Sequence, residues 1–285
     1  MTAVNGIERG PGGAAGPAWR RCLLNAGDAI KILVRPERIH PREGWLPAPR
    51  QLAIACVIIV VLFVLGMFFV DAPVTSAAMR LPRWVQSFFD TITDYGKSGW
   101  FLWPIGLLFL ALAALPPFAP RVAQVVLAAM MVRVGFLFAA IGVPSLFDTI
   151  IKRMIGRARP MVTGHLDPTL FSPFIWHSDY ASLPSGHVTT AFAVLVAFST
   201  LWPRSRTVFL IYAVLIAMSR VVVTAHFTTD VLMGALVGTV GALMVRRWFA
   251  LRRLGFSIGP DGVPHMYPGP SVRRIKSVAR ALLAP

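Results

Sequence analysis

Residues 218–230 read MSRVVVTAHFTTD and join two long apolar runs. The stretch holds Arg220, His226 and Asp230, which are unfavourable beside hydrophobic segments in a membrane and therefore mark a candidate functional site. His226 and Asp230 are four residues apart, so on a helical turn they share one face. Asp230 is predicted to accept the N–H of one imidazole nitrogen, which leaves the other as a nucleophile or base. The alternative is a buried ion pair beside an arginine at a helix end.

The composition indicates an integral membrane protein. Of 285 residues, 56% are hydrophobic and 14% are charged, whereas soluble domains carry about 25% charged residues. The net charge of +16 comes mostly from basic residues near the two ends of the chain. That distribution favours contact with anionic headgroups over binding of nucleic acid. The two cysteines, Cys22 and Cys56, suggest neither a disulfide framework nor a metal site.

Six apolar runs predict an all-α polytopic protein with a bundle of six transmembrane helices, because only helices satisfy their own backbone in lipid. The runs cover 52–70, 100–118, 122–147, 188–202, 208–223 and 231–249. A span needs roughly 20 residues, so the fourth and fifth runs cross only with their polar ends included. We expect a basic, partly disordered cytoplasmic segment over 1–50, the membrane domain over 51–250 and a basic cytoplasmic tail over 251–285. Arg133 interrupts the third run and is predicted to snorkel, face the bundle or mark a kink.

The basic residues also predict the orientation. With both termini on one side, that side receives 19 lysines and arginines and the other receives 7. The positive-inside rule then places the termini in the cytoplasm. Residues 152–159, 184–187 and 224–229 all fall at the opposite face. We therefore expect a site at the non-cytoplasmic face, which in a bacterial inner membrane is the periplasmic face.

Four cations, Lys152, Arg153, Arg157 and Arg159, lie within eight residues. The cluster is typical of an anion clamp, since lysine supplies a point charge and arginine a bidentate fork. A basic loop beside lipid headgroups is the alternative. Pro160 is predicted to end the preceding helix and to fix the direction of Arg159.

The sequence Pro184-Ser185-Gly186-His187 precedes the fourth apolar run. Proline and serine favour a helix start, and the free N–H groups of a helix N-terminus bind anions. Gly186 lets the backbone approach a ligand closely, and His187 is suited to donate a proton to a departing oxygen. A helix cap with an incidental histidine is the alternative. Together with His226, these groups predict a phosphate site that contains an acid, a base and a nucleophile.

The chain resembles the type 2 phosphatidic acid phosphatase superfamily in three ordered motifs: Lys152-x6-Arg159-Pro160, Pro184-Ser185-Gly186-His187 and Ser219-Arg220-x5-His226-x3-Asp230. The resemblance covers about residues 51–250 and implies a six-helix membrane phosphatase that needs no metal or other cofactor. It implies that His226 attacks phosphorus, that Asp230 orients it and that His187 protonates the leaving group. The implied phosphate ligands are Lys152, Arg159, Ser185, Gly186 and Arg220. Arg153 and Arg157 fall outside the fixed motif positions and receive no catalytic role.

The expected substrate is a membrane lipid phosphate at headgroup level. Candidates are undecaprenyl diphosphate, phosphatidic acid, phosphatidylglycerol phosphate and lipid A phosphates. The loop 161–183 contains several aromatic residues and is predicted to form an interfacial belt or to cover the site. His165 and His177 lie on this loop and are candidates for the rim of the site. A phosphotransferase with the same intermediate is an open alternative. A haloperoxidase conflicts with the apolar runs, and a non-enzymatic transporter or channel would not need two histidines at motif spacing.

Overall fold

The computed structural model of the chain describes residues 19–20, 23–24, 27–28, 31, 35–38, 47–114, 121–259 and 262–283. Most of the segment 1–50, for which partial disorder is expected, falls outside these ranges. From residue 47 onward the elements are α2 (Pro49–Phe69), α3 (Asp71–Met79), α4 (Arg83–Thr93), η1 (Asp94–Gly96), α5 (Gly99–Ala114), α6 (Arg121–Ile155), η2 (Ser178–Tyr180), α7 (Gly186–Leu201), η3 (Pro203–Ser205), α8 (Arg206–Val222), α9 (Thr228–Leu251), β1 (Phe256–Ile258), β2 (Pro264–Met266) and α10 (Val272–Leu283).

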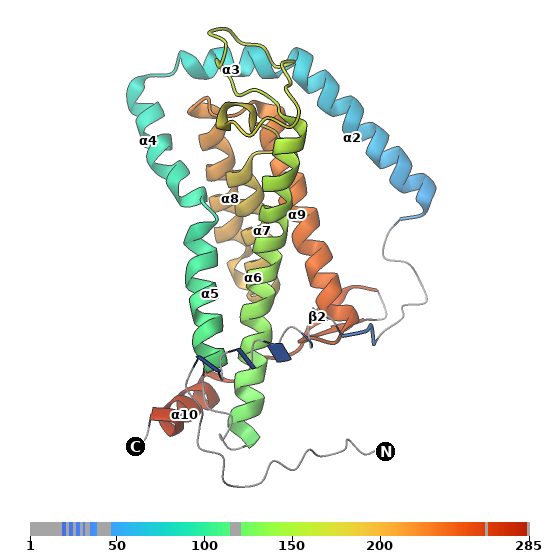
Figure 1. Cartoon of the computed structure of the whole chain (residues 1–285), viewed down its shortest axis with the longest axis vertical. Coiled ribbons are helices and arrows are strands. Elements are labelled where there is room, and N and C mark those ends of the chain that lie inside the picture. Colours follow the sequence, from blue (N-terminus) through green and yellow to red (C-terminus); the bar gives the residue numbers. More distant parts are fainter. Residues whose placement is uncertain are drawn as a thin grey trace.

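The predicted all-α membrane class is confirmed. Helices α6, α7, α8 and α9 run side by side, and α5 packs along α6 (Figure 1). The core between α6, α7 and α9 is apolar and includes the fully buried Phe136, Ile141 and Val194. In the described ranges, sheet structure is limited to the antiparallel hairpin β1–β2 at one end of the bundle.

Five described helical segments have the length and apolar composition of a membrane span: Pro49–Phe69, Arg83–Ala114, Ala123–Ile155, Pro203–Val222 and Thr228–Leu251. The remaining predicted span corresponds to α7, a shorter apolar helix of 16 residues. Five of its first eight residues are buried, because α6, α8 and α9 all pack against it. Its position inside the bundle means that α7 does not have to match the thickness of the hydrocarbon core by itself.

Two glycines of α9 allow close contact with α7. A Cβ atom at Gly238 would lie 2.2 Å from the carbonyl oxygen of Thr189, and one at Gly234 would lie 2.6 Å from that of Ser185. Small residues at a four-residue spacing are a common way for membrane helices to approach each other. The contact holds the N-terminus of α7 against the first turns of α9, where the second and third motifs meet.

We expect Gly238→Ala to destabilise the protein by about 1–3 kcal/mol, because the added methyl group overlaps a backbone oxygen that cannot move independently. That corresponds to a fall in the melting temperature of roughly 2–12 °C. Gly142→Ala is the matched control, because its Cβ would lie 3.6 Å from the side chain of Leu102, an ordinary contact. Equal melting temperatures for the two variants in detergent would contradict the close packing.

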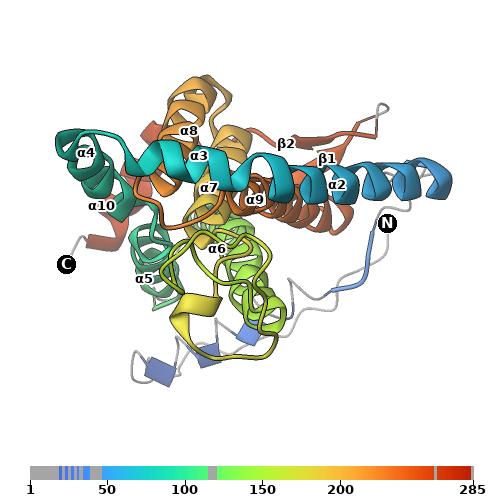
Figure 2. The ribbon, with the colours of Figure 1, turned by 90° about the horizontal axis from the view of Figure 1, so that it is seen from above.

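Helices α2 and α3 lie outside the apolar core, and only α3 packs closely on the end of the bundle. Helix α2 has no buried residue and leans away from the bundle (Figure 1). Helix α3 crosses the ends of α8 and α9, as the view from above shows (Figure 2). This crossing brings Asp71, the first residue of α3, into the interior, where it is fully buried.

Helix α6 ends earlier than the sequence predicts. The helix stops at Ile155 because Gly156 adopts a left-handed conformation with φ of 65°. A side chain at Gly156 would collide with the backbone of Ser172, so glycine is required there. The predicted role of Pro160 as the helix terminator is therefore wrong. The chain turns four residues before Pro160 and carries Arg157 and Arg159 away from the helix axis.

Candidate active site

The three motifs meet at the end of the bundle that α3 crosses. Each of the predicted side chains lies at or near a helix end, where backbone groups and side chains can point at a common ligand. Lys152 lies at the end of α6, and Arg159 lies in the loop beyond it. Ser185, Gly186 and His187 lie at the start of α7, Arg220 lies in the last turn of α8, and His226 and Asp230 lie around the start of α9. The predicted start of α7 is confirmed, since Ser185 is its N-cap and Gly186 its first residue.

The imidazole of His226 is held in one orientation. Its Nδ1 lies 2.8 Å from the carbonyl oxygen of Ser182, and because a carbonyl only accepts, Nδ1 carries the proton. Nε2 therefore keeps its lone pair. The side chain is almost completely buried. A neutral, fixed and desolvated imidazole is suited to nucleophilic attack.

Asp230 does not form the hydrogen bond to His226 that the sequence predicts. Its Oδ2 lies 3.9 Å from Nδ1 of His226 and instead accepts from the Ser182 hydroxyl at 2.6 Å and from the Phe227 amide at 3.0 Å. The reason is local. Helix α9 begins at Thr228, so His226 precedes the helix, while Asp230 caps its first turn. The carboxylate still lies close enough to stabilise a positive charge on the imidazole.

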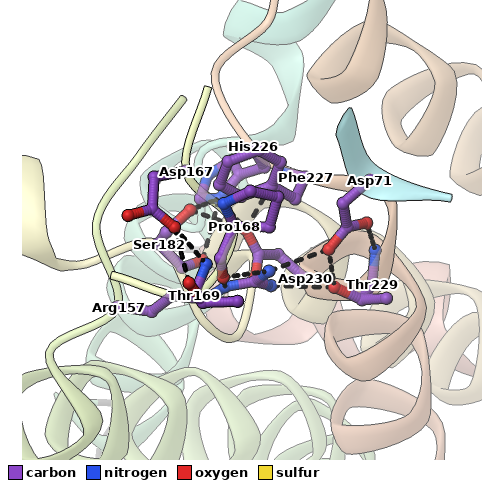
Figure 3. Close-up of polar contacts among 10 residues, drawn as sticks. All are labelled: Asp71, Arg157, Asp167, Pro168, Thr169, Ser182, His226, Phe227, Thr229 and Asp230. Atoms are coloured by element: carbon purple, nitrogen blue, oxygen red, sulfur yellow. Dashed lines mark hydrogen bonds and ion pairs between the residues drawn. The ribbon is translucent and has the colours of Figure 1, made fainter. Parts of the chain in front are cut away.

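Arg157 is the residue that the sequence reasoning missed. Its side chain is fully buried and its two terminal nitrogens reach Asp230 at 2.5 Å and Asp71 at 2.8 Å (Figure 3). It also donates to the hydroxyl of Thr229 at 2.8 Å and to the carbonyl of Pro168. The guanidinium therefore joins α3, the 157–182 loop and α9 around the carboxylate that supports His226.

Asp71 completes this network. Its carboxylate accepts from the amide and the hydroxyl of Thr229, at 2.9 and 2.6 Å. The position of Asp71 directly after an apolar run was a usable signal, because an acidic residue at such a point is a functional candidate. Arg157 carried a signal as well, since it lies within the cationic motif. Ser182 and Thr229 carried none in the sequence.

Three polar atoms of the motif residues are buried and have no hydrogen-bond partner in the part of the chain that the structure describes: Oγ of Ser185, Nε of Arg159 and Nε of Arg220. A buried donor without a partner is unfavourable by about 1–3 kcal/mol, so three such atoms on motif residues favour a ligand site. Two guanidiniums and a helix N-terminus suit an anion such as phosphate. In the same described part, no group of three or more His, Cys, Asp or Glu side chains is placed to hold a metal ion.

Lys152 is positioned by a carboxylate that the sequence analysis did not select. Its Nζ lies 2.5 Å from Oδ2 of Asp148, one turn earlier on α6. Asp148 is nearly fully buried and also accepts from the hydroxyl of Thr189 at 3.3 Å. Both Lys152 and Asp148 lie close to Gly186, so the lysine points toward the start of α7.

A cavity of about 230 Å³ adjoins this point. Lys152, Gly186 and His187 line one part of it, while Lys97 and Ser98 line the part nearest α5. The residues of the network, Arg157, Asp71 and Asp230, do not line this cavity. The cavity therefore lies beside the Lys152 and His187 part of the site, on the side of α5 and α6.

The loop between α6 and α7 is ordered over the site. Backbone hydrogen bonds link Ala158 to Leu170, Arg159 to Asp179 and Ser182 to Arg157. His165 and His177 lie exposed on this loop, and their hydrogen-bond partners, Thr163 and Asp179, belong to the loop itself. The structure therefore does not bring either histidine to His226. Trp176, which lies over Arg153, exposes 83% of its surface.

Burial lowers the pKa of His226 well below the usual 6.5, and the nearby cations Arg220 and Arg159 lower it further. The sign follows from the charge of the protonated ring, which is disfavoured both by the loss of water and by positive neighbours. The lone pair on Nε2 is therefore available at and below neutral pH.

We expect the imidazole of His226 to stay neutral as the pH falls from about 7.5 to 5.5, since burial and the neighbouring cations lower its pKa well below 6.5. The measurement is the chemical shift of ¹⁵N-labelled histidine side chains in detergent, with the His226→Gln spectrum to assign the signal. A titration midpoint for His226 within or above this pH range would contradict the effect of burial and of the neighbouring cations.

The sequence profile of the PAP2 superfamily matches residues 133–254. Lipid A 1-phosphatase of Rhizobium johnstonii is 34% identical over 202 residues, which cover 70% of this chain and 82% of that protein. Lipid A 1-phosphatase of Rhizobium etli is 34% identical over 212 residues, which cover 74% and 90%.

Two solved structures are similar at 21% identity. They are LpxE of Aquifex aeolicus, with a TM-score of 0.45 over 62% of this chain and 94% of that one, and a transmembrane PAP2-type phosphatidylglycerolphosphate phosphatase of Bacillus subtilis, with a TM-score of 0.44 over 67% and 94%.

The multi-pass helical fold and the two relatives together define a membrane lipid phosphatase. The chain belongs to the PAP2 superfamily. The resemblance seen in the three sequence motifs is thereby confirmed.

Proposed function

We propose that this enzyme hydrolyses a phosphate monoester of lipid A, or of a lipid of the same class, through a phosphohistidine at His226. The observation that supports the phosphate site is the set of buried, unpartnered donors on Ser185, Arg159 and Arg220. The choice of lipid A among the candidate lipids rests on the two lipid A 1-phosphatases that are 34% identical to the chain over most of its length.

In the first step, Nε2 of His226 attacks phosphorus in line with the lipid oxygen. The N–P bond forms as the P–O bond to the lipid breaks, and His187 gives its proton to the departing oxygen. The imidazole gains a positive charge, which the Ser182 carbonyl and the Asp230 carboxylate stabilise. Lys152, Arg159 and Arg220, with the Ser185 hydroxyl and the Gly186 amide, hold the three equatorial oxygens, on which charge is spread.

In the second step, His187 is neutral and removes a proton from a water molecule. The water oxygen attacks phosphorus, the N–P bond breaks and the electron pair returns to Nε2 of His226. Phosphate leaves, and His187 is again protonated. The same two histidines thus serve both steps, and no further co-reactant is needed.

The proposal includes a location. The excess of basic residues on the side of the termini, 19 against 7, supports cytoplasmic termini and a site at the periplasmic face of a bacterial inner membrane. There the phosphate of a lipid in the outer leaflet lies level with Lys152 and His187, and its acyl chains remain in the bilayer.

The test is phosphate release by the purified full-length protein in detergent with EDTA present. The panel contains lipid A, undecaprenyl diphosphate, phosphatidic acid and phosphatidylglycerol phosphate, with His226→Ala as the inactive comparison and mass spectrometry of the lipid product. We expect the wild type to release phosphate from lipid A fastest and the variant to release none. His165→Ala, which changes an exposed loop histidine, is the matched control and should retain activity.

Each other outcome contradicts a defined part of the proposal. Faster release from another lipid would refute the assignment of lipid A but keep the phosphatase chemistry. No release from a folded protein, together with a labelled phosphohistidine that is discharged by an alcohol or lipid acceptor, would identify a phosphotransferase. Equal release by His226→Ala would refute the role of His226.

A further inference from the structure

A large cavity lies at the end of the bundle opposite the active site. Its volume is about 900 Å³, and it lies where α6, α7 and α9 meet the C-terminal segment. In Figure 1 this is the end where β2 and α10 lie, away from α3. The hairpin and α10 follow residue 254 and so lie beyond the PAP2 match. The proposed phosphatase chemistry makes no use of this cavity.

Two arginines line the cavity, Arg133 of α6 and Arg246 of α9. Arg133 donates to the carbonyl of Ala129 at 2.8 Å and to that of Tyr267 at 2.9 Å, so it joins α6 to the segment after β2. The described residues that line the cavity include no aspartate or glutamate. The two positive charges are therefore not neutralised by the wall around them.

Two polar atoms in the same wall are buried without a hydrogen-bond partner among the described residues. They are Nε of Arg246 and Oγ of Ser199, on α9 and α7. An orphaned N–H and an orphaned hydroxyl beside two arginines form a donor set for an anion. The rest of the wall is largely apolar and includes Leu137 and Ile275, which favours an anion attached to an apolar body.

The depth of the two arginines in the membrane indicates from which leaflet the anion comes. Arg133 precedes Lys152 by 19 residues on α6, and Arg246 follows Asp230 by 16 residues on α9. At about 1.5 Å per residue these separations are roughly 24–29 Å, close to the hydrocarbon thickness of about 30 Å. The cavity thus lies at headgroup level of the leaflet opposite the active site.

Helix α10 adds positive charge beside the cavity. Its Val278 packs against Ala123 and Val126 of α6, while Arg273, Arg274, Lys276 and Arg280 are exposed. A helix with one packed apolar side and exposed cations is suited to a surface of anionic lipid.

We propose that this cavity binds the phosphate of an anionic phospholipid from the leaflet opposite the active site. The phosphate accepts from Arg246, Ser199 and Arg133, and the apolar wall receives the glycerol and the first part of the acyl chains. The bound lipid ties the hairpin and α10 to the transmembrane bundle. This site is distinct from the phosphate site at His226 and does not depend on the proposed reaction.

The test is native mass spectrometry of the full chain in detergent, with phosphatidylglycerol as the probe and melting temperature as a second measurement. Phosphatidylglycerol is a phosphodiester, so the phosphatase does not consume it. We expect binding and a raised melting temperature for the wild type, and at least about tenfold weaker binding for Arg246→Gln and for Ser199→Leu. Arg246→Lys should retain most of the binding, because lysine keeps the positive charge. Comparing it with Arg246→Gln distinguishes an effect of charge from an effect of misfolding.

The control is Arg204→Gln, because Arg204 is exposed in η3 and does not line the cavity. Equal weakening by this variant would overturn the proposal, since it would show general attraction to positive charge. Equal binding of phosphatidylcholine would overturn the role of the lipid's net negative charge. Competition by inorganic phosphate at similar concentration would reassign the cavity to a free anion and also overturn it.

Discussion

Replacing His226 with glutamine is expected to lower kcat by about 10⁴-fold or more, because an amide has no nucleophilic ring nitrogen with which to attack phosphorus. Glutamine keeps a polar side chain of similar size in the buried position. The fold should therefore survive, and the proposed phosphate ligands Lys152, Arg159 and Arg220 should still hold the lipid. We expect KM to change far less than kcat.

His187→Gln distinguishes the two steps. An aryl phosphate has a leaving group that needs no proton, so His226 should still attack it, whereas the hydrolysis of phosphohistidine should be slow without a base at 187. We expect one equivalent of phenolate to be released rapidly per enzyme, with alkali-stable label on His226. His165→Ala should behave as wild type. A burst from His226→Gln, or kcat of that variant within about tenfold of wild type, would contradict nucleophilic attack by His226.

Replacing Arg157 with lysine is expected to lower kcat by at least about 100-fold and to destabilise the protein by roughly 3–5 kcal/mol. Lysine keeps one charge but not the planar fork that reaches Asp71 and Asp230 together. Asp230 then loses a buried partner, and the Ser182 segment that orients His226 loosens. Because Arg157 acts through Asp230 rather than on the substrate, KM should change less than kcat.

Arg153→Lys is the matched control, since Arg153 lies four residues earlier in the sequence, in the last turn of α6, and its guanidinium lies over the exposed Trp176. We expect its activity to stay within about threefold of wild type. The measurements are steady-state kinetics and thermal unfolding in the same detergent. Wild-type kcat in Arg157→Lys, or a rise in KM with kcat unchanged, would show that Arg157 does not position the nucleophile.

Several features of the protein followed from local patterns. The apolar runs predicted the helical membrane class, because a span must be about 20 apolar residues long whatever surrounds it. The sequence also predicted the helix start at Ser185 and Gly186, since a helix cap depends on residues adjacent in sequence. The three motifs predicted a common site before any helix packing was known, and the chain does bring their backbone segments together at one end of the bundle.

Other features depended on contacts between distant segments. The hydrogen bond expected from Asp230 to His226 assumed a continuous helical turn, yet α9 begins between these two residues. The end of α6 was assigned to Pro160, although the left-handed Gly156, packed against Ser172, ends it earlier. For Arg133 the sequence left three alternatives, namely to snorkel, to face the bundle or to mark a kink. Only the structure showed its hydrogen bond to the carbonyl of Tyr267.

The sequence by itself determined that this chain is a helical membrane protein with the three motifs of the PAP2 superfamily, because composition and motif spacing are properties of the chain alone. The tertiary structure decided which carboxylates and cations become partners. Arg157 lies 86 residues from Asp71 and 73 from Asp230, and pairing over such distances results from the packing of α3, the loop and α9. Burial makes those pairs strong, and burial is a property of the assembled bundle.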